Sequence, residues 1–416
     1  DETFSGCTNI VTFTVASKLT SIGDKAFYMC EKIKSIYLPD DITTIGESAF
    51  YGCKALSEVT LPDSITDLGD YAFKDCDNLA KVIIPLKLAN VGVQAFDNTK
   101  WYANLSVYEE APTENKFHIY GDGVLIKADI IDNTSIVIPE NVKSIAAFTF
   151  TNWGKINDRE FYNSKLPKSI TIPDGVTSIG DYAFYFCENL ETVFISNTVT
   201  SIGEKAFYGC KNLKVITLPD SLTEIKPYAF YGCSALPEIT LPSTLTSIGS
   251  YAFYDCYNLT EIEIPENSTK IVKDMLAGCS SLTNVKIPSS VTELEDSCFQ
   301  GCKSLTNIII PKSVKSIGER AFSGCESLTH ITIPEGIEVI QEGTFRRCKS
   351  LESIIIPASV TEIDWIAFED CTSLKEITFP AGLKIRKDSF EGCKSINTIY
   401  VPAKKTDYYK KRLPES

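Results

Sequence analysis

The chain has 416 residues, of which 44% are hydrophobic and 23% charged, and its formal net charge is −14. This apolar content can form a buried core, which argues against a disordered chain. The acidic balance argues against nucleic-acid binding that is independent of sequence and against docking on anionic lipid. No apolar run reaches the roughly 18 residues that a membrane-spanning helix needs. With only two histidines, His118 and His330, most histidine-based metal and acid–base sites are disfavoured.

The chain begins inside a pattern that recurs later. Thr3-Phe4-Ser5-Gly6-Cys7 corresponds to the Ala-Phe-Ser-Gly-Cys stretch in the middle of a later unit. Either the natural protein continues upstream or a different segment caps this end. Because an initiator Met and a signal-peptide pattern are absent, we expect a mature or trimmed chain whose signal peptide or lipid anchor has been removed.

A period of 23 residues runs along most of the chain. The chain is therefore expected to be one long array of repeats and not the two or three ordinary domains that its length suggests. Proline and phenylalanine keep the same period as cysteine. The cysteines of the period, the last of which follows after 22 residues, are Cys7, Cys30, Cys53, Cys76, Cys187, Cys210, Cys233, Cys256, Cys279, Cys302, Cys325, Cys348, Cys371 and Cys393.

One unit, residues 312–334, reads KSVKSIGERAFSGCESLTHITIP. Ile331 and Ile333 alternate with Thr332, which is typical of a short strand, and Pro334 ends the strand because it has no N–H to donate. The GERAFSGC segment predicts a tight turn or one helical turn. A single unit cannot bury enough surface to fold alone, whereas stacked units bury both faces. The period and the L-x-x-I-x-I pattern therefore predict a curved leucine-rich-repeat solenoid of fifteen to sixteen units, each a strand plus a turn or short helix.

The period fails between residues 97 and 173. Residues 1–96 form a first array, 97–173 are irregular repeats with insertions, 174–402 form a second array, and 403–416 are a basic, tyrosine-rich cap or tail. Gly121-Asp122-Gly123 predicts a hairpin turn. A second insertion runs from about residue 152 to 164 and carries Trp153. The insertions either protect an imperfect stack or form a protruding binding loop.

The I-G-x-x-A-F-x-G-C-x-x-L-x-x-I-x-I-P unit resembles the BspA-like, Treponema pallidum-type leucine-rich repeats over nearly the whole chain. The resemblance implies a bacterial cell-surface protein, similar to secreted members from gut and oral anaerobes, some of which adhere to host matrix proteins or to other bacteria. The family has no shared catalytic or binding motif to carry over. A named ligand therefore does not follow from the resemblance.

Two rows of side chains are candidate binding surfaces. The second residue before each recurrent proline is expected to point out of the strand, so its large members are candidate anchors, although β-propensity alone also explains them. The fourth residue before the proline is mixed polar and includes Glu58, Lys81, Glu238 and Glu261. The candidate anchors are Tyr37, Phe194, Ile309, Ile355 and Tyr400.

The second candidate surface is a tyrosine row beside the Ala-Phe pairs of four consecutive repeats. Its members either stack to cover the solenoid or supply aromatic contact area for a protein or glycan partner. They are Tyr182, Tyr185, Tyr208, Tyr228, Tyr231, Tyr251, Tyr254 and Tyr257.

Other recurrent residues favour structural roles. One cysteine in each repeat predicts a buried packing row, and without a C-x-x-C motif the zinc spacing is missing. An acidic row predicts a solvated turn, with a calcium site as the alternative. We expect neither a cofactor nor a metal. The acidic row comprises Asp24, Glu47, Asp70, Asp181, Glu204, Glu319 and Glu342.

These patterns predict a secreted or cell-surface, adhesin-like protein without enzymatic activity, which recognises host or microbial protein or glycan, is not inserted in the membrane, and is a monomer. Two alternatives stay open. One is a surface lipoprotein that captures glycans or nutrients, and the other is a protein-binding effector or a passive spacer.

Overall fold

The computed structural model describes residues 1–14, 18–85, 88, 90–105, 115–121, 123–130, 135–147, 149–150, 153–156, 159–162 and 167–402. The expected tail, 403–416, lies outside the described residues. The chain divides into two compact units. Unit 1 comprises residues 1–190 and 202–206, and unit 2 comprises residues 191–201 and 207–416.

In both units the residues before most of the recurrent prolines form parallel strands, which pair with neighbouring repeats in runs of two to four. These strands are here called the first ladder. In β5 (Glu58–Thr60), Val59 is buried while its neighbours are exposed, and β5 pairs with β7 (Lys81–Ile83) in register. The sixteen predicted strand positions are confirmed, since fifteen form strands and Glu238 forms an isolated bridge to Glu261.

The first ladder of unit 1 comprises β1 (Thr12–Thr14), β3 (Ser35–Tyr37), β5, β7, β11 (Ser135–Val137) and β15 (Ser169–Ile172). That of unit 2 comprises β17 (Thr192–Ile195), β19 (Val215–Thr217), β22 (Glu261–Glu263), β24 (Asn284–Lys286), β26 (Asn307–Ile308), β28 (His330–Ile331), β30 (Ser353–Ile355), β32 (Glu376–Thr378) and β34 (Thr398–Tyr400).

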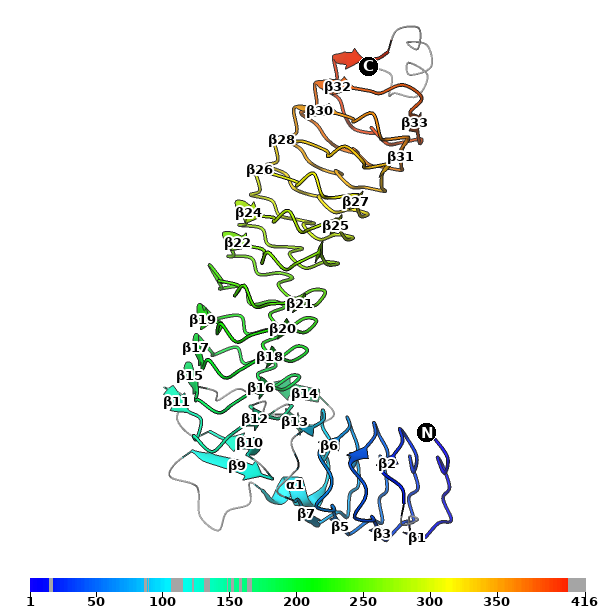
Figure 1. Ribbon diagram of the computed structural model, residues 1–416, viewed down its shortest axis with the longest axis vertical. Helices are drawn as coiled ribbons and strands as arrows, with labels where there is room; N and C mark the ends of the chain where they lie inside the picture. Colours follow the sequence, from blue (N-terminus) through cyan, green and yellow to red (C-terminus); the bar gives the residue numbers. More distant parts are fainter. Residues whose placement is uncertain are drawn as a thin grey trace. The chain divides into compact units, whose positions relative to one another are not determined.

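A second ladder of two-residue strands lies directly before the predicted turn segment, at residues for which the sequence pattern predicts no strand. Its isoleucine is buried, and the next residue donates its N–H to the isoleucine one repeat back, as Gly46 does to the Ile22 carbonyl at 2.8 Å. In unit 2 the labelled strands of the two ladders follow opposite edges of the stack (Figure 1).

The second ladder of unit 1 comprises β2 (Ser21–Ile22), β4 (Thr44–Ile45), β6 (Asp67–Leu68), β8 (Asn90–Val91), β12 (Ser144–Ile145) and β16 (Ser178–Ile179). That of unit 2 comprises β20 (Glu224–Ile225), β21 (Ser247–Ile248), β23 (Lys270–Ile271), β25 (Glu293–Leu294), β27 (Ser316–Ile317), β29 (Val339–Ile340), β31 (Glu362–Ile363) and β33 (Lys384–Ile385), and β18 (Ser201–Ile202) lies at the boundary of the two units.

The segment between the second ladder and the next strand consists of successive turns. Ala26 donates to Gly23 at 3.3 Å and Cys30 donates to Phe27 at 3.1 Å, both across three residues. Lys25 and Met29 have φ values of 52° and 57°. A left-handed residue interrupts a right-handed helix, so two of them in one segment prevent a helical turn from continuing. Of the two predicted forms, the tight turn is therefore the one that forms.

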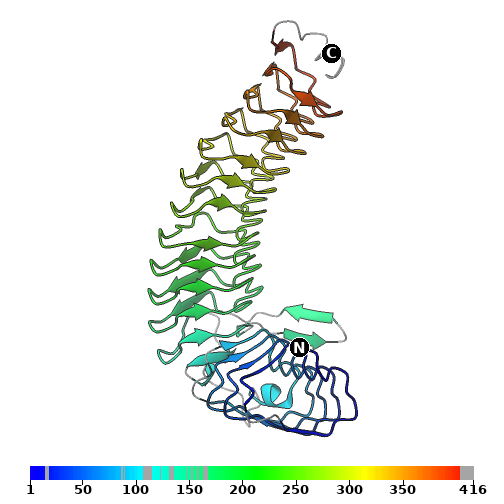
Figure 2. The same cartoon turned by 45° about the vertical axis from the view of Figure 1, so that its right-hand side comes forward.

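Each unit is held together by a stack of phenylalanine rings in its core. Phe27 and Phe50 lie 5.1 Å apart with rings 4° from parallel, and Phe322 and Phe345 lie 5.7 Å apart at 4°. In unit 2 the stack is interrupted at Leu276, which takes the phenylalanine position of its repeat and is fully buried. The ring stack runs along the successive turns that Figure 2 shows in each unit.

The irregular region of unit 1 replaces a cysteine by a helix cap. Thr99 occupies the cysteine position, is buried, and accepts the Tyr102 N–H at 3.1 Å to begin α1 (Lys100–Asn104). α1 is the only helix among the described residues. It is not long and apolar enough to cross a bilayer.

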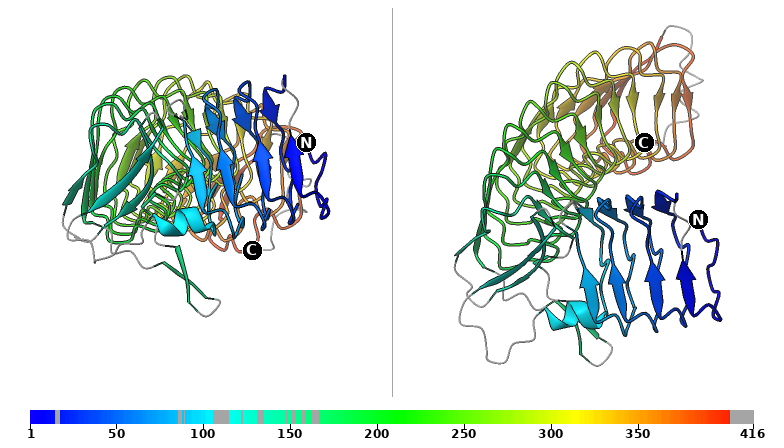
Figure 3. Two further views of the ribbon diagram at one scale, coloured as in Figure 1. Left: turned by 90° about the horizontal axis from the view of Figure 1, so that it is seen from below. Right: turned by 60° about the horizontal axis from the view of Figure 1, so that its bottom comes forward.

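Two hairpins follow α1 in the irregular region. β9 (Lys116–Tyr120) and β10 (Val124–Asp129) pair antiparallel around Gly121–Gly123, which confirms the predicted hairpin turn. The backbone of the second insertion forms another hairpin, β13 (Trp153–Ile156) with β14 (Arg159–Tyr162). Figure 3 shows β1, β3, β5 and β7, which precede α1 in the chain, side by side.

Candidate functional site

The second residue before the proline points outward in both units, as predicted. All five candidate anchors are exposed, Tyr37 in unit 1 and the others in unit 2. In unit 2, Ile309, Ile355 and Tyr400 are 76%, 70% and 53% exposed. Thr332 and Thr378 stand between them, and β30, β32 and β34 pair so that Ile355, Thr378 and Tyr400 are direct neighbours. These five residues, Ile309, Thr332, Ile355, Thr378 and Tyr400, are here called the strand row.

The first ladder of unit 2 is interrupted next to a pair of like charges. In most repeats the residue at this position donates its backbone N–H to a carbonyl of the preceding repeat. Proline has no N–H, so Pro237 cannot do so, and Glu238 makes only an isolated bridge. Glu238 and Glu261 are in-register neighbours, both exposed. At the equivalent positions of unit 1, Glu58 and Lys81 form an ion pair with a 3.5 Å separation.

A hollow of about 280 Å³ lies beside this pair of charges, over the repeats of Glu238, β22 and β24. Glu263 pairs with Lys286 on its rim. The hollow therefore keeps an acidic excess at Glu238 and Glu261. It is lined by Glu238, Ile239, Thr240, Leu241, Glu261, Ile262, Glu263, Asn284 and Lys286.

The tyrosines of unit 2 form two columns of parallel rings. Tyr208, Tyr231 and Tyr254 stack with centroids 4.5 and 4.8 Å apart, and Tyr228 stacks on Tyr251 at 4.6 Å. They belong to the turn segment after the second ladder, so they form a surface separate from the strand row. Tyr182 and Tyr185 belong to unit 1 and pack edge to face.

The stacking limits what the tyrosine columns can bind. Both faces of the Tyr231 ring are covered by its neighbours, so a sugar ring cannot lie on that face. Burial, together with a hydrogen bond to Asp274, raises the pKa of Tyr251 to about 12. Tyr257 stands outside the columns and is 47% exposed. The structure thus brings five of the eight predicted tyrosines together mainly through mutual packing.

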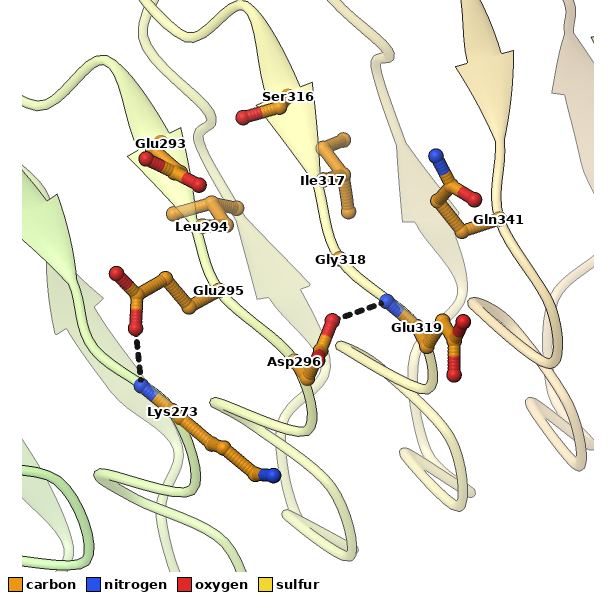
Figure 4. A pocket seen from close by; sticks show the side chains of 10 residues that line it. All are labelled: Lys273, Glu293, Leu294, Glu295, Asp296, Ser316, Ile317, Gly318, Glu319 and Gln341. Carbon is orange, nitrogen blue, oxygen red and sulfur yellow. Dashed lines mark hydrogen bonds between the residues drawn. The ribbon is translucent and has the colours of Figure 1, made fainter.

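A larger acidic pocket of about 430 Å³ lies along the second ladder of unit 2, around β25 and β27 (Figure 4). Its carboxylates are engaged in the fold. Glu295 accepts the Lys273 backbone N–H at 2.9 Å, and Asp296 accepts that of Glu319 at 2.9 Å. Glu293 pairs with Lys270 at 2.7 Å. Among the described residues, no group of three or more His, Cys, Asp or Glu side chains could hold a metal ion.

The acidic row gains a role that its sequence pattern did not indicate. The Asp24 carboxylate accepts the backbone N–H of Glu47, one repeat on, at 2.8 Å. Asp181 does the same for Glu204 at 2.7 Å. The row therefore links consecutive repeats through backbone N–H groups.

Comparison with known proteins identifies the repeat. The family model for the BspA type leucine rich repeat region, in six copies, matches residues 1–110, 154–281 and 293–411. The chain belongs to this family. A search of curated proteins finds no match.

This BspA-type chain is similar to three solved structures. A leucine-rich repeat protein from Bacteroides ovatus is 27% identical over 100% of this chain and 84% of that one, with a TM-score of 0.38. A leucine rich cell surface protein from Faecalibacterium prausnitzii is 26% identical over 75% and 99%, with a TM-score of 0.44. The T. pallidum leucine rich repeat protein is 29% identical over 38% and 88%, with a TM-score of 0.30.

The cysteine row of this BspA-type chain is confirmed as a packing row. Fourteen of the fifteen thiols are buried, and only Cys7 is partly exposed. The thiol of Cys53 donates to the Phe27 carbonyl at 3.4 Å, and that of Cys325 donates to Phe299 at 3.3 Å. Each cysteine thus closes a contact with the preceding repeat.

Replacing Tyr231 with Ser should destabilise unit 2. The change removes two stacked ring pairs, each of which contributes about 0.5–1.5 kcal/mol beyond area burial, and a tilted contact with Tyr228 at 6.1 Å, so we expect a loss of at least about 1–3 kcal/mol. Urea unfolding followed by far-UV circular dichroism measures it. Tyr257→Ser, outside the columns, is the control, and equal losses in the two variants would contradict a stacking role.

Proposed function

We propose that this protein is a non-catalytic, secreted or cell-surface protein, adhesin-like, that binds a host or microbial macromolecule through the first ladder of unit 2. The observation that carries this proposal is that Ile309, directly after β26, and Ile355 and Tyr400, in β30 and β34, are exposed on the side away from the core. Large apolar side chains that remain exposed at fixed intervals are characteristic of interaction surfaces.

The rigidity of the scaffold supports the same proposal. The row is carried by strands whose central residues, such as Ile354 and Ile377, are buried and paired with the next repeat. A pre-organised row loses little conformational freedom when a partner binds, and that loss is a large part of the cost of association. Membership of a family that includes a neighbour described as a cell surface protein is consistent with a surface location.

The double replacement Ile309→Ser and Ile355→Ser tests this function. We expect the variant to fold normally, because both side chains are exposed, and to lose at least about tenfold in affinity, as for the removal of two central anchors. Binding of the purified chain to an array of host matrix proteins, bacterial surface proteins and glycans measures the effect.

The matched control is Trp365→Ser, which removes an exposed apolar side chain from the turn segment. Unchanged binding by the double variant would contradict the proposal. Replacing tyrosines with Phe keeps the rings stacked and removes only the hydroxyls. Loss of glycan binding in a Tyr254→Phe variant would favour the glycan-capturing alternative, and no binding to any probe would favour a spacer.

A further inference from the structure

We propose that the first ladder of unit 2 binds an extended segment of a partner protein that carries a Lys or Arg followed by large apolar side chains. The cation would lie between Glu238 and Glu261, and the apolar side chains would lie on the strand row. This inference rests on the proposed function and specifies the chemistry of its partner.

The acidic end of the surface is unusual in how its charges are arranged. At several other places in unit 2, acids on neighbouring repeats face cations, as in the ion pairs of Glu326 with Lys349 at 3.0 Å and Glu352 with Lys375 at 3.6 Å. Glu238 and Glu261 instead place two like charges side by side, which destabilises a pair of strands. A partner cation between them would remove that repulsion, so the site favours a basic group.

The local fold explains why a side chain can enter there. Pro237 has no N–H to donate to the preceding repeat, as Thr260 and Thr283 do, and Glu238 makes only an isolated bridge. The hollow of about 280 Å³ lies next to it, over Glu238, β22 and β24. The hollow has space for a lysine or arginine side chain but not for a helix, which is about 10 Å across. An extended segment is therefore the form of partner that suits both the hollow and a row one side chain wide.

The spacing of the surface sets the spacing of the partner. Neighbouring strands lie about 4.8 Å apart, so Ile309 and Ile355, two repeats apart in the same row, lie about 10 Å from each other. Glu261 lies two repeats before Ile309 and two residues back along its strand, about 12 Å away, and a long Lys or Arg side chain spans the difference. A polyproline II segment rises about 3.1 Å per residue and returns the same face every third residue. The matching partner pattern is a basic residue with large apolar residues three and six positions further on.

A labelled peptide, Arg-Pro-Pro-Leu-Pro-Pro-Leu-Pro-Pro, tests the proposal by fluorescence anisotropy with the full chain. We expect saturable binding that weakens as salt rises, and about tenfold weaker binding after Glu261→Lys, because a contact between opposite charges becomes a repulsion. The same protein should bind a peptide with Glu in place of Arg at least about tenfold more weakly.

Glu261→Lys is expected to leave the fold intact, because the resulting pair of Glu238 with a lysine reproduces the Glu58–Lys81 pair of unit 1. The matched control is Glu391→Lys, an equal charge change at an exposed acid in a turn segment, and it should change affinity less than about twofold. Circular dichroism confirms that both variants fold.

The proposal is overturned if the Arg and Glu peptides bind equally, if Glu261→Lys and Glu391→Lys weaken binding equally, or if only a helical peptide with the same side chains seven residues apart binds. Failure of the proposed function is distinguishable. If the proposed function fails, the double variant Ile309→Ser and Ile355→Ser binds the array as well as the wild type does. If only this inference fails, that double variant still loses array binding, whereas Glu261→Lys does not.

Discussion

Replacing Phe322 with Ala is expected to lower the free energy of unfolding by about 3–5 kcal/mol. Phe322 is fully buried, and its ring stacks between Phe299 at 5.4 Å and Phe345 at 5.7 Å. The truncation leaves a cavity that neither ring can fill, because each is held by its own repeat. Urea unfolding followed by far-UV circular dichroism measures the loss.

Phe322→Leu is the control for this prediction, since Leu276 already occupies the phenylalanine position of another repeat. We expect it to cost less than half as much as Phe322→Ala. Because repeats are stabilised mainly by their neighbours, the Ala variant should also lose hydrogen-exchange protection first around residues 299–345. Equal urea midpoints for wild type and Phe322→Ala would refute the role of the phenylalanine stack.

Raising the pH from 8 to 11 is expected to unfold the protein. Burial raises the pKa of the Cys325 thiol to about 12. Burial also raises the pKa of eight other cysteines of the row and of Cys298. These thiols stay protonated in the folded chain and ionise in the unfolded chain near their ordinary value.

The sign of the pH dependence follows from proton binding. Above the ordinary thiol pKa the unfolded state binds fewer protons than the folded state, so stability falls as pH rises toward the folded pKa. A fully buried thiol such as Cys325 contributes about 1.4 kcal/mol of loss per pH unit in that window. Several thiols acting together exceed the roughly 5–15 kcal/mol by which domains are stable.

Urea midpoints at pH 7, 9, 10 and 11, measured with a reductant present, test this expectation. The raised pKa of Tyr251 acts in the same direction. A variant with Cys325→Ala and Cys348→Ala should show a shallower fall above pH 9, even though the substitutions lower its stability at pH 7. A stability that stays level up to pH 11 would be incompatible with a row of buried protonated thiols.

The repeating part of the fold could be predicted because its signal recurs. Ile331, Ile333 and Pro334 mark a strand whose equivalents appear in every unit, so one misread residue does not matter. The second ladder was missed because two residues, such as Ser316 and Ile317, are too few to show alternation. The turns were left open between two forms because left-handed backbone at residues such as Lys25 has no sequence signature outside glycine and asparagine.

The candidate site was predictable only where it repeats. The outward direction of Ile309 and Ile355 follows from period-two alternation, and the structure confirms it. The missing strand at Glu238 accompanies one proline outside the period, Pro237. The pair of like charges beside the hollow depends on which side chains become neighbours across repeats. The stacking of Tyr231 between two tyrosines depends on the distance between repeats. The sequence does not fix that distance, so it could not decide whether these tyrosines pack on one another or bind a partner.

The constant offset of the contacts between repeats has a genetic consequence. Thr43, Thr66 and Lys54 each bond to a residue 23 positions earlier, and Cys53 bonds to one 26 positions earlier. Duplication or deletion of one whole 23-residue unit therefore preserves the bonds to backbone carbonyls, such as those of Thr43 and Cys53, between the new neighbours, whereas an ion pair such as Lys54–Glu31 depends on which side chains then meet. Unequal crossing-over between repeats can lengthen or shorten the molecule, and reposition its exposed rows, without passing through a chain that fails to fold.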